Sequence, residues 1–182
     1  MTTAAAAWGV FCLFFIPFGP GIPGGVLLAQ KHGIGWPWME ALYFLSDVGL
    51  ALIFEPLMHL TIAAGERHPR LGFILAKMSE STRKTTAAYG TSGSPLALIL
   101  IAFGVDPMTG RAAAKAHGHG PVSGWALAIT GDMLYFTVLM VSTLFLNDIL
   151  GDGTKTMAVI LLLMFVIPPL IKKWRERGAR PA

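Results

Sequence analysis

Apolar residues fill five long stretches of the chain, and polar residues separate them. The stretches cover about residues 4–29, 38–64, 87–116, 122–146 and 156–171. Apolar runs of about 18 or more residues exceed the usual length of a core helix and are typical of membrane-spanning segments. The pattern therefore predicts an all-α polytopic membrane protein.

Proline and glycine interrupt the first and third stretches. The first contains the sequence PFGPGIPGG over residues 17–25, and the third contains Gly90, Gly93, Pro95, Gly104, Pro107 and Gly110. Irregular backbone at membrane depth is tolerated only where protein buries it or where it lines a polar cavity. We expect each broken stretch to form a re-entrant helical hairpin, which leaves about three full transmembrane helices.

Two segments of the chain resemble each other. Pro23, Ala29, Lys31, Pro37 and Ser46-Asp47 recur as Pro107, Ala113, Lys115, Pro121 and Gly131-Asp132. The proline and the lysine are eight residues apart in both copies, but the aspartate follows the second proline after ten residues in one and eleven in the other. A single crossing separates the copies, so we expect an inverted structural repeat, as in many transporters.

Composition and charge indicate the class of protein and its orientation. Hydrophobic residues make up 54% of the 182 residues, charged residues only 13%, and the mean hydropathy is +0.61. Basic residues concentrate in segments 65–86 and 172–182, which the positive-inside rule places in the cytoplasm. We expect a multi-pass protein of the inner (plasma) membrane with a cytoplasmic C-terminus, and we expect no nucleic-acid partner.

The expected organisation is a single transmembrane domain over residues 1–182. It consists of repeat one (about 4–64), the polar cytoplasmic segment (65–86), repeat two (about 87–171) and the basic cytoplasmic tail (172–182).

Two aspartates lie within apolar stretches at matching places in the repeat. Asp47 and Asp132 are nine and ten residues into their stretches, which corresponds to a depth of roughly 15 Å, near the centre of the hydrocarbon. An aspartate there costs about 2.5–3.5 kcal/mol. Burial disfavours the charged form of a carboxyl group, so both residues are candidate proton carriers. The alternative is a structural role, with a hydroxyl of Ser46, Thr130 or Tyr135 tying the carboxylate into the helix packing.

Further polar residues in the helices are candidates for proton transfer or substrate binding. Glu55 and His59 form an i, i+4 pair that could relay protons or, equally, make an interfacial ion pair. Arg111, Lys31 and Lys115 suit an anionic group, although snorkelling to headgroups would also explain them. Three glycines at the hairpin breaks could offer backbone amides to an anion or simply permit tight turns: Gly21, Gly24 and Gly90.

His117 and His119 raise the question of a metal site. Asp106 is the nearest acidic residue, and neither a cysteine nor a carboxylate cluster accompanies the histidines. Two histidines alone make a weak site. We therefore predict no metal and no cofactor.

The two Pro/Gly-broken hairpins, residues 17–25 and Asp106-Pro-Met-Thr-Gly-Arg111, are each followed by a helix and resemble those of the DedA (VTT) and related small multidrug-export proteins. The resemblance implies two facing re-entrant hairpins that move lipid carriers or other amphiphiles. It also implies membrane-embedded acids and an arginine, which by position are Asp47, Asp132 and Arg111. The first hairpin lacks the carboxylate often found in this family, and Glu40 is the nearest acid. The early Gly-Pro-Gly is also similar to that of the LysE group of exporters.

These features favour a proton-coupled secondary transporter, not an enzyme. It would move a small anionic or amphiphilic substrate by alternating access, with membrane lipid and protons as partners. A homodimer is expected because few helices surround the site. Two alternatives stay open. Gly90-Thr-Ser-Gly93 matches the motif of rhomboid serine hydrolases, with Ser92 as nucleophile and His117 as base, although only 25 residues separate the two. The other alternative is a passive channel.

Overall fold

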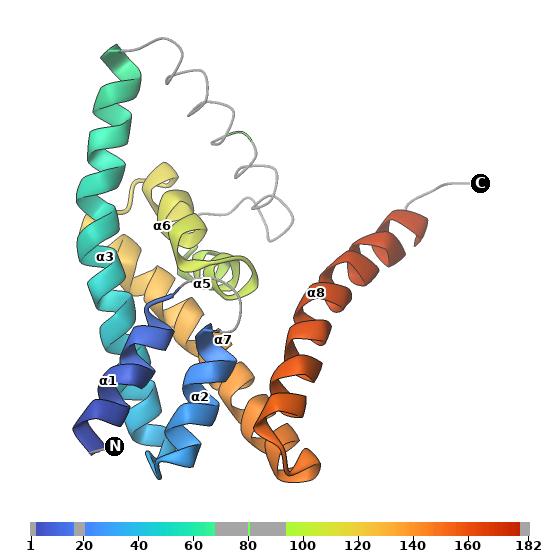
Figure 1. Cartoon of the computed structure of the whole chain (residues 1–182). Coiled ribbons are helices and arrows are strands. Elements are labelled where there is room, and N and C mark those ends of the chain that lie inside the picture. The colour runs from blue at the N-terminus through green and yellow to red at the C-terminus, as the bar shows by residue number, and fades with distance from the viewer. Residues whose placement is uncertain (1–2, 17–20, 68–79, 81–93, 179–182) are drawn as a thin grey trace. The chain divides into compact units, whose positions relative to one another are not determined.

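The computed structural model describes residues 3–16, 21–67, 80 and 94–178. Within these ranges the chain forms seven helices and no strand (Figure 1). They are α1 (Thr3–Phe14), α2 (Gly21–Lys31), α3 (Trp36–Arg67), α5 (Pro95–Gly104), α6 (Pro107–Ala116), α7 (Pro121–Leu150) and α8 (Gly153–Gly178). The prediction of an all-α fold is confirmed for this part of the chain.

The helices divide into two compact units. The central unit comprises Glu40–Thr137, and the terminal unit comprises Met1–Met39 together with Val138–Ala182. The boundaries fall inside α3 and α7, so they differ from the boundaries of the two expected repeats.

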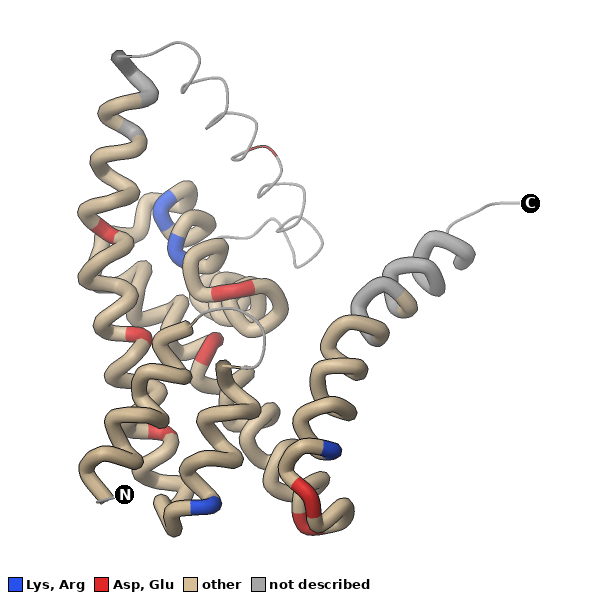
Figure 2. Tube along the Cα trace, viewed as in Figure 1, with Lys and Arg blue, Asp and Glu red and all other residues tan. Residues whose placement is uncertain are grey.

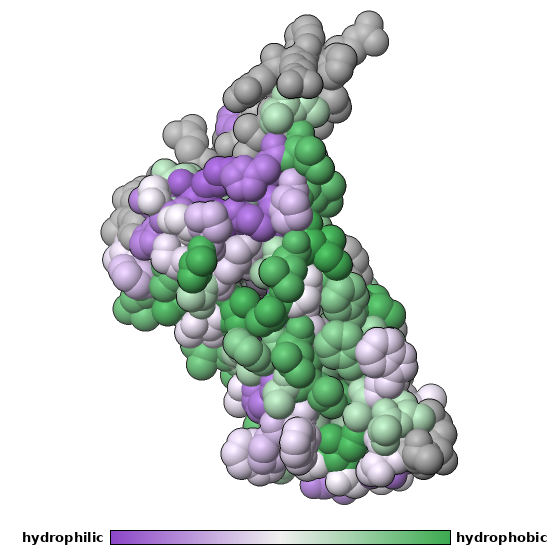
Figure 3. Space-filling model, turned by 90° about the vertical axis from the view of Figure 1, so that its left-hand side faces the viewer, coloured by the Kyte–Doolittle hydropathy of each residue, from purple (hydrophilic) through white to green (hydrophobic). Residues whose placement is uncertain are grey.

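Two helices are long and apolar enough to cross a membrane. These are α3, over Trp36–Thr61 (26 residues), and α7, over Pro121–Leu150 (30 residues). Charged residues are sparse among the described residues of the trace (Figure 2), and hydrophobic residues cover much of the face shown in Figure 3. The described apolar part of α8, Gly153–Val166, is shorter than a membrane span. Two of the three predicted crossings therefore meet the length criterion.

Both Pro/Gly-broken stretches fold as pairs of short helices. Helices α1 and α2, of 12 and 11 residues, pack against each other in the terminal unit, and α5 and α6, of 10 residues each, do so in the central unit. At 1.5 Å per residue such helices extend about 15–18 Å, roughly half the hydrocarbon thickness. Glycine permits the close approach within each pair. A Cβ on Gly25 would overlap the Phe14 ring, and one on Gly110 would lie 2.6 Å from the Ala102 Cβ.

Helices α2 and α6 end in the same hydrogen-bonding pattern, 85 residues apart. The amide of Gly33 donates to Gln30 and that of Ile34 to Ala29, as Gly118 donates to Lys115 and His119 to Ala114. Gly33 and Gly118 have left-handed backbone conformations, with φ of 70° and 82°. This conformation lets the amides that follow each helix donate hydrogen bonds to its last carbonyl groups.

The same spacing offers a second alignment of the two similar segments. Asp47 and Asp132 are also 85 residues apart, so the unequal spacing in the proline-based alignment disappears when the helix ends are aligned. Lys31 and Lys115 are then not equivalent, because Lys115 occupies the position of Gln30.

The core of the central unit joins α5 and α6 to α3 and α7. Leu98, Ile101, Ala113 and Ala114 form one cluster, against which Leu127 packs. Ala102, Trp125 and Ala128 form a second cluster, against which Ala51, Phe54 and Ile129 pack. A Cβ on Gly131 would overlap the Ile99 carbonyl oxygen and lie 2.7 Å from the Ala102 Cβ. Small residues thus allow α7 to lie directly against α5, beside Asp132.

In the terminal unit, polar contacts connect α2, α7 and α8. The Asn147 amide donates to Gln30 Oε1 at 2.8 Å, and Thr156 donates to Asn147 Oδ1 at 3.1 Å. Asp152 precedes α8 and accepts hydrogen bonds from the amides of Thr154 (2.8 Å) and Lys155 (3.2 Å). These amides hold the pKa of the Asp152 carboxyl below its usual value.

Candidate functional site

Three hydrogen bonds connect α3 to α7 within the central unit. Thr137 donates to Glu40 at 2.9 Å, Tyr43 to Asp132 at 2.9 Å, and the Trp125 indole to Glu55 at 2.7 Å. The residue numbers rise along α3 as they fall along α7, so the two segments run antiparallel. Each of these bonds ends on a carboxyl group, and these groups together with Asp47 define the candidate site.

Asp47 and Asp132 meet in the interior. Their exposed fractions are 3% and 6%, and the two carboxyl groups are close enough to interact electrostatically. Two carboxyl groups in contact cannot both be ionised without strong repulsion, so such a pair favours a shared proton. Asp47 Oδ2 has no hydrogen-bond partner among the described residues. The pair therefore retains an acceptor that a proton or a water molecule could use.

Tyr43 is the polar residue that positions the pair. Its hydroxyl donates to Asp132 Oδ2, and its ring stacks on Phe136 with the centroids 4.0 Å apart. We did not identify Tyr43 from the sequence. The available signal was its position four residues before Asp47, which places both side chains on one face of a helix.

Two of the three hydroxyls considered as partners of the aspartates have other acceptors. Ser46 donates to the Tyr43 carbonyl at 2.6 Å, and Thr130 donates to the Ala126 carbonyl at 2.7 Å. Each bond stays within its own helix, α3 for Ser46 and α7 for Thr130. Neither hydroxyl therefore ties an aspartate carboxyl group to the helix packing.

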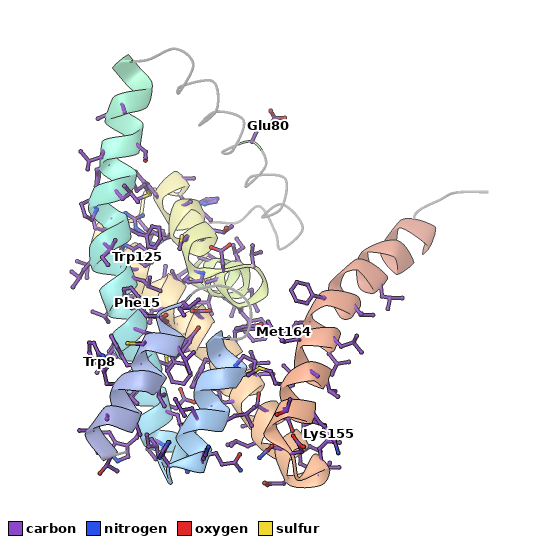
Figure 4. The ribbon with its side chains drawn as sticks, in the orientation of Figure 1. Trp8, Phe15, Glu80, Trp125, Lys155 and Met164 are labelled. Carbon is purple, nitrogen blue, oxygen red and sulfur yellow. The ribbon has the colours of Figure 1, made fainter. Side chains whose placement is uncertain are left out.

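A second polar cluster surrounds Glu55. Arg111 binds it through both carboxylate oxygens, Nε at 3.0 Å and Nη2 at 2.7 Å. The Trp125 indole donates to Oε2 at 2.7 Å, and His59 Nε2 lies 3.2 Å from Oε1. Trp125 projects from α7 toward α3, as Figure 4 shows. The i, i+4 pair of Glu55 and His59 thus forms, as part of a larger cluster.

This cluster changes the interpretation of Arg111. The side chain is 3% exposed, and two of its three guanidinium nitrogens bind Glu55. Only Nη1 has no hydrogen-bond partner in the described part of the chain. A bidentate carboxylate contact already neutralises the guanidinium, so an anion at Arg111 would have to compete with Glu55.

The other predicted site residues that the structure describes belong to α2 and α6. Lys31 and Lys115 lie in the last turns of α2 and α6. A Cβ on Gly21 would lie 2.6 Å from the Ile16 carbonyl oxygen, and one on Gly24 would lie 3.1 Å from Met157 Cε. Both glycines therefore serve close packing, which is the alternative that the sequence left open. Gly90 lies outside the described residues.

The residues considered for a hydrolase or a metal site are Ser92, His117 and His119. Ser92 lies outside the described ranges. His117 Nδ1 is 2.9 Å from the Ala113 carbonyl oxygen at the end of α6. Among the described residues, no three His, Cys, Asp or Glu side chains group closely enough to hold a metal ion.

Comparison of the chain with protein-family models, with curated proteins and with solved structures found no match.

Proposed function

We propose that the chain is an integral inner-membrane secondary transporter in which Asp47 and Asp132 carry the coupling proton. The observation that carries this proposal is the meeting of two buried aspartates from positions 85 residues apart. A carboxyl pair in an apolar environment is costly, and it is well suited to taking up and releasing a proton.

The proposed architecture is an inverted repeat. The turns at Gly33 and Gly118 share one hydrogen-bonding pattern, and each precedes a long helix, α3 or α7. The antiparallel contacts between these helices in the central unit support opposite orientations for the two copies. In this proposal the α1–α2 and α5–α6 pairs are re-entrant hairpins and α8 is the third crossing. The C-terminal tail is cytoplasmic, and two copies of the chain form the transporter.

The mechanism follows from the aspartate pair and the packing around it. Protonation removes the repulsion between the carboxyl groups, and deprotonation restores it, so the proton biases the distance between α3 and α7. Gly131 lies beside Asp132 and directly against α5, which gives a change at the pair a path to the second hairpin. Proton binding would thereby shift the population between outward-open and inward-open states. The substrate is a small amphiphile, because Glu55 already binds the Arg111 guanidinium that was expected to bind an anion.

Proteoliposomes containing a pH-sensitive dye test the proposal. Polyprenyl phosphate, phospholipid, amino acids, divalent metal ions and a lipophilic cation are added in turn, and proton movement is recorded. We expect at least one compound to drive proton movement in the wild type and less than about a tenth of that rate in Asp47→Asn and Asp132→Asn. Equal rates in the wild type and both variants would remove the proposed mechanism. A passive channel would instead conduct the compound without proton movement. A Ser92→Ala variant that lost a hydrolytic activity would favour the hydrolase.

A further inference from the structure

A groove lies on the surface of the central unit between α3 and α7. Its volume is about 480 Å³, and it is open to the outside of the helix pair. The lining residues are Glu40 and Phe44 from α3 and Ala126, Ile129, Thr130, Met133, Leu134 and Thr137 from α7. From Ala126 to Thr137 the groove extends about 16 Å along α7. It is therefore long enough for a bulky apolar molecule.

The groove contains one ionisable residue, Glu40, and no basic residue. The Glu40 carboxylate accepts a hydrogen bond from the Thr137 hydroxyl at 2.9 Å. No ion pair neutralises Glu40 in the part of the chain that the structure describes. Because the other lining residues are apolar or carry a single hydroxyl, the groove combines an apolar body with one negative charge at its end.

Glu40 lies at the end of the groove that is close to the exposed tryptophans of α3. It follows Trp36 and Trp38, which are 64% and 70% exposed, as is typical of aromatic residues at a membrane surface. Apolar residues such as Phe44 and Leu134 continue the groove along the helices. A ligand with a positive end at Glu40 and an apolar remainder would match both parts.

We infer that the α3–α7 groove binds lipophilic cations and that Glu40 selects them by charge. This inference rests on the proposed transport function and names its substrate class. A lipophilic anion of the same shape would be repelled by Glu40 and would find no basic residue in the lining.

The groove also lies near the aspartate pair. Glu40 and Asp47 are seven residues apart on α3, and Met133 in the lining is next to Asp132. Seven residues correspond to about 10 Å of helix, a distance over which charges interact appreciably outside bulk water. A cation bound in the groove would therefore favour release of the shared proton, which gives exchange of a proton for a cation.

Equilibrium binding of tetraphenylphosphonium and tetraphenylborate tests the inference, because the two ions have similar shapes and opposite charges. The full chain in nanodiscs of zwitterionic lipid is expected to bind tetraphenylphosphonium saturably and tetraphenylborate at least about tenfold more weakly, a difference of about 1.4 kcal/mol. Glu40→Gln should weaken tetraphenylphosphonium binding by about tenfold, and Glu40→Asp should largely preserve it. Asp148→Asn removes an equal charge outside the groove and should leave binding unchanged. Equal binding of the two ions, or no effect of Glu40→Gln, would overturn the inference.

A second variant and a second readout separate this inference from the transport proposal. Thr130→Trp fills the groove while Glu40 remains, and we expect it to abolish saturable tetraphenylphosphonium binding. Unchanged binding would place the cation elsewhere and overturn the inference. Saturable, Glu40-dependent binding without proton movement in proteoliposomes would contradict the transport proposal and leave the cation site standing. Proton movement with another compound, without tetraphenylphosphonium binding, would contradict the cation site and leave the transport proposal standing.

Discussion

Tyr43 combines a polar and an apolar contact in one side chain, and the two can be separated. Tyr43→Phe retains the ring that stacks on Phe136 and removes the hydroxyl that donates to Asp132. Loss of a buried hydrogen bond costs about 1–2 kcal/mol, so we expect a modestly less stable, folded protein. Proton-coupled flux should fall more than stability does, because Asp132 loses its positioning contact.

Unfolding in detergent and dye-reported flux in proteoliposomes measure the two effects of Tyr43→Phe. A Tyr43→Phe variant with wild-type flux would show that the hydroxyl has only a packing role.

The Glu55–Arg111 pair permits a double-mutant cycle. Removing one member of a buried ion pair costs about 3–5 kcal/mol, because the remaining charge is left buried without a partner. We expect Glu55→Leu, which leaves the 3%-exposed Arg111 without its partner, to destabilise the protein by about 3 kcal/mol, and the double variant Glu55→Leu, Arg111→Met to cost clearly less than the sum of the single changes. Equilibrium unfolding measures all three variants. His59→Ala serves as the control, since His59 is 58% exposed and should contribute under about 1 kcal/mol. Additive effects would contradict the coupling.

At this scale, the sequence predicted residues whose chemistry is unusual for their surroundings. Asp47 and Asp132 were identifiable because an acid in an apolar run is costly. Tyr43 and Trp125 were not, since an aromatic residue in an apolar helix normally packs. The partner of Arg111 was also unpredictable. Glu55 is 56 residues away in sequence, and only the packing of α3 against α6 and α7 in the central unit brings the two together.

Among the elements, α5 and α7 can pack closely because Gly131 has no side chain. Gly131→Ala would force the Ile99 backbone and Ala102 away from α7. Overpacking of this kind costs about 1–3 kcal/mol, and the displacement would disturb Asp132. Gly120→Ala is the matched control, because a Cβ there meets nothing within 4 Å. Thermal unfolding should separate the two variants, and equal melting temperatures would contradict the close approach.

The start of α8 depends on a cap that responds to pH. The amides of Lys155 and Thr154 lower the pKa of Asp152 in the folded protein. The cap therefore stabilises the fold above the unfolded pKa of about 3.9, and this contribution is lost as the pH falls through the lower, folded value. Asp152→Asn keeps a capping side chain without this titration. Melting temperature between about pH 5 and pH 3 should fall more steeply in the wild type than in Asp152→Asn. Parallel curves would contradict the prediction.

The elements themselves were largely predictable. Proline and glycine marked where both broken stretches divide, since Pro107 begins α6 and Gly104 ends α5. The register of the repeat was not predictable, because the proline-based alignment ignored the helix ends. The register that we propose follows the left-handed glycines Gly33 and Gly118, whose hydrogen bonds have the same pattern.

For the whole molecule, the proposed inverted repeat predicts the side of the membrane on which each turn lies. Gly35 and Gly120 occupy equivalent exposed positions, 85 residues apart, after the two left-handed glycines. Gly35→Cys and Gly120→Cys, each in a Cys12→Ser background, should react with a membrane-impermeant maleimide from opposite faces. Labelling of both from the same face would contradict the inverted arrangement.

The whole-molecule prediction from the sequence was the least complete. Apolar length identified α3 and α7 as candidate spans. It did not establish a third crossing, because the described apolar part of α8 is short. The two compact units also differ from the two expected repeats, since antiparallel packing of α3 and α7 groups the middle of the chain.

The central claim is that Asp47 and Asp132 share one proton in a buried pair. Infrared spectroscopy of the protein in a detergent without carbonyl groups tests it through the carbonyl stretch of a protonated carboxyl group at neutral pH. We expect this band in the wild type, in Glu40→Gln and in Asp148→Asn, and we expect its loss in the double variant Asp47→Asn, Asp132→Asn. A wild-type spectrum without the band, or a band that persists in the double variant, would contradict the account.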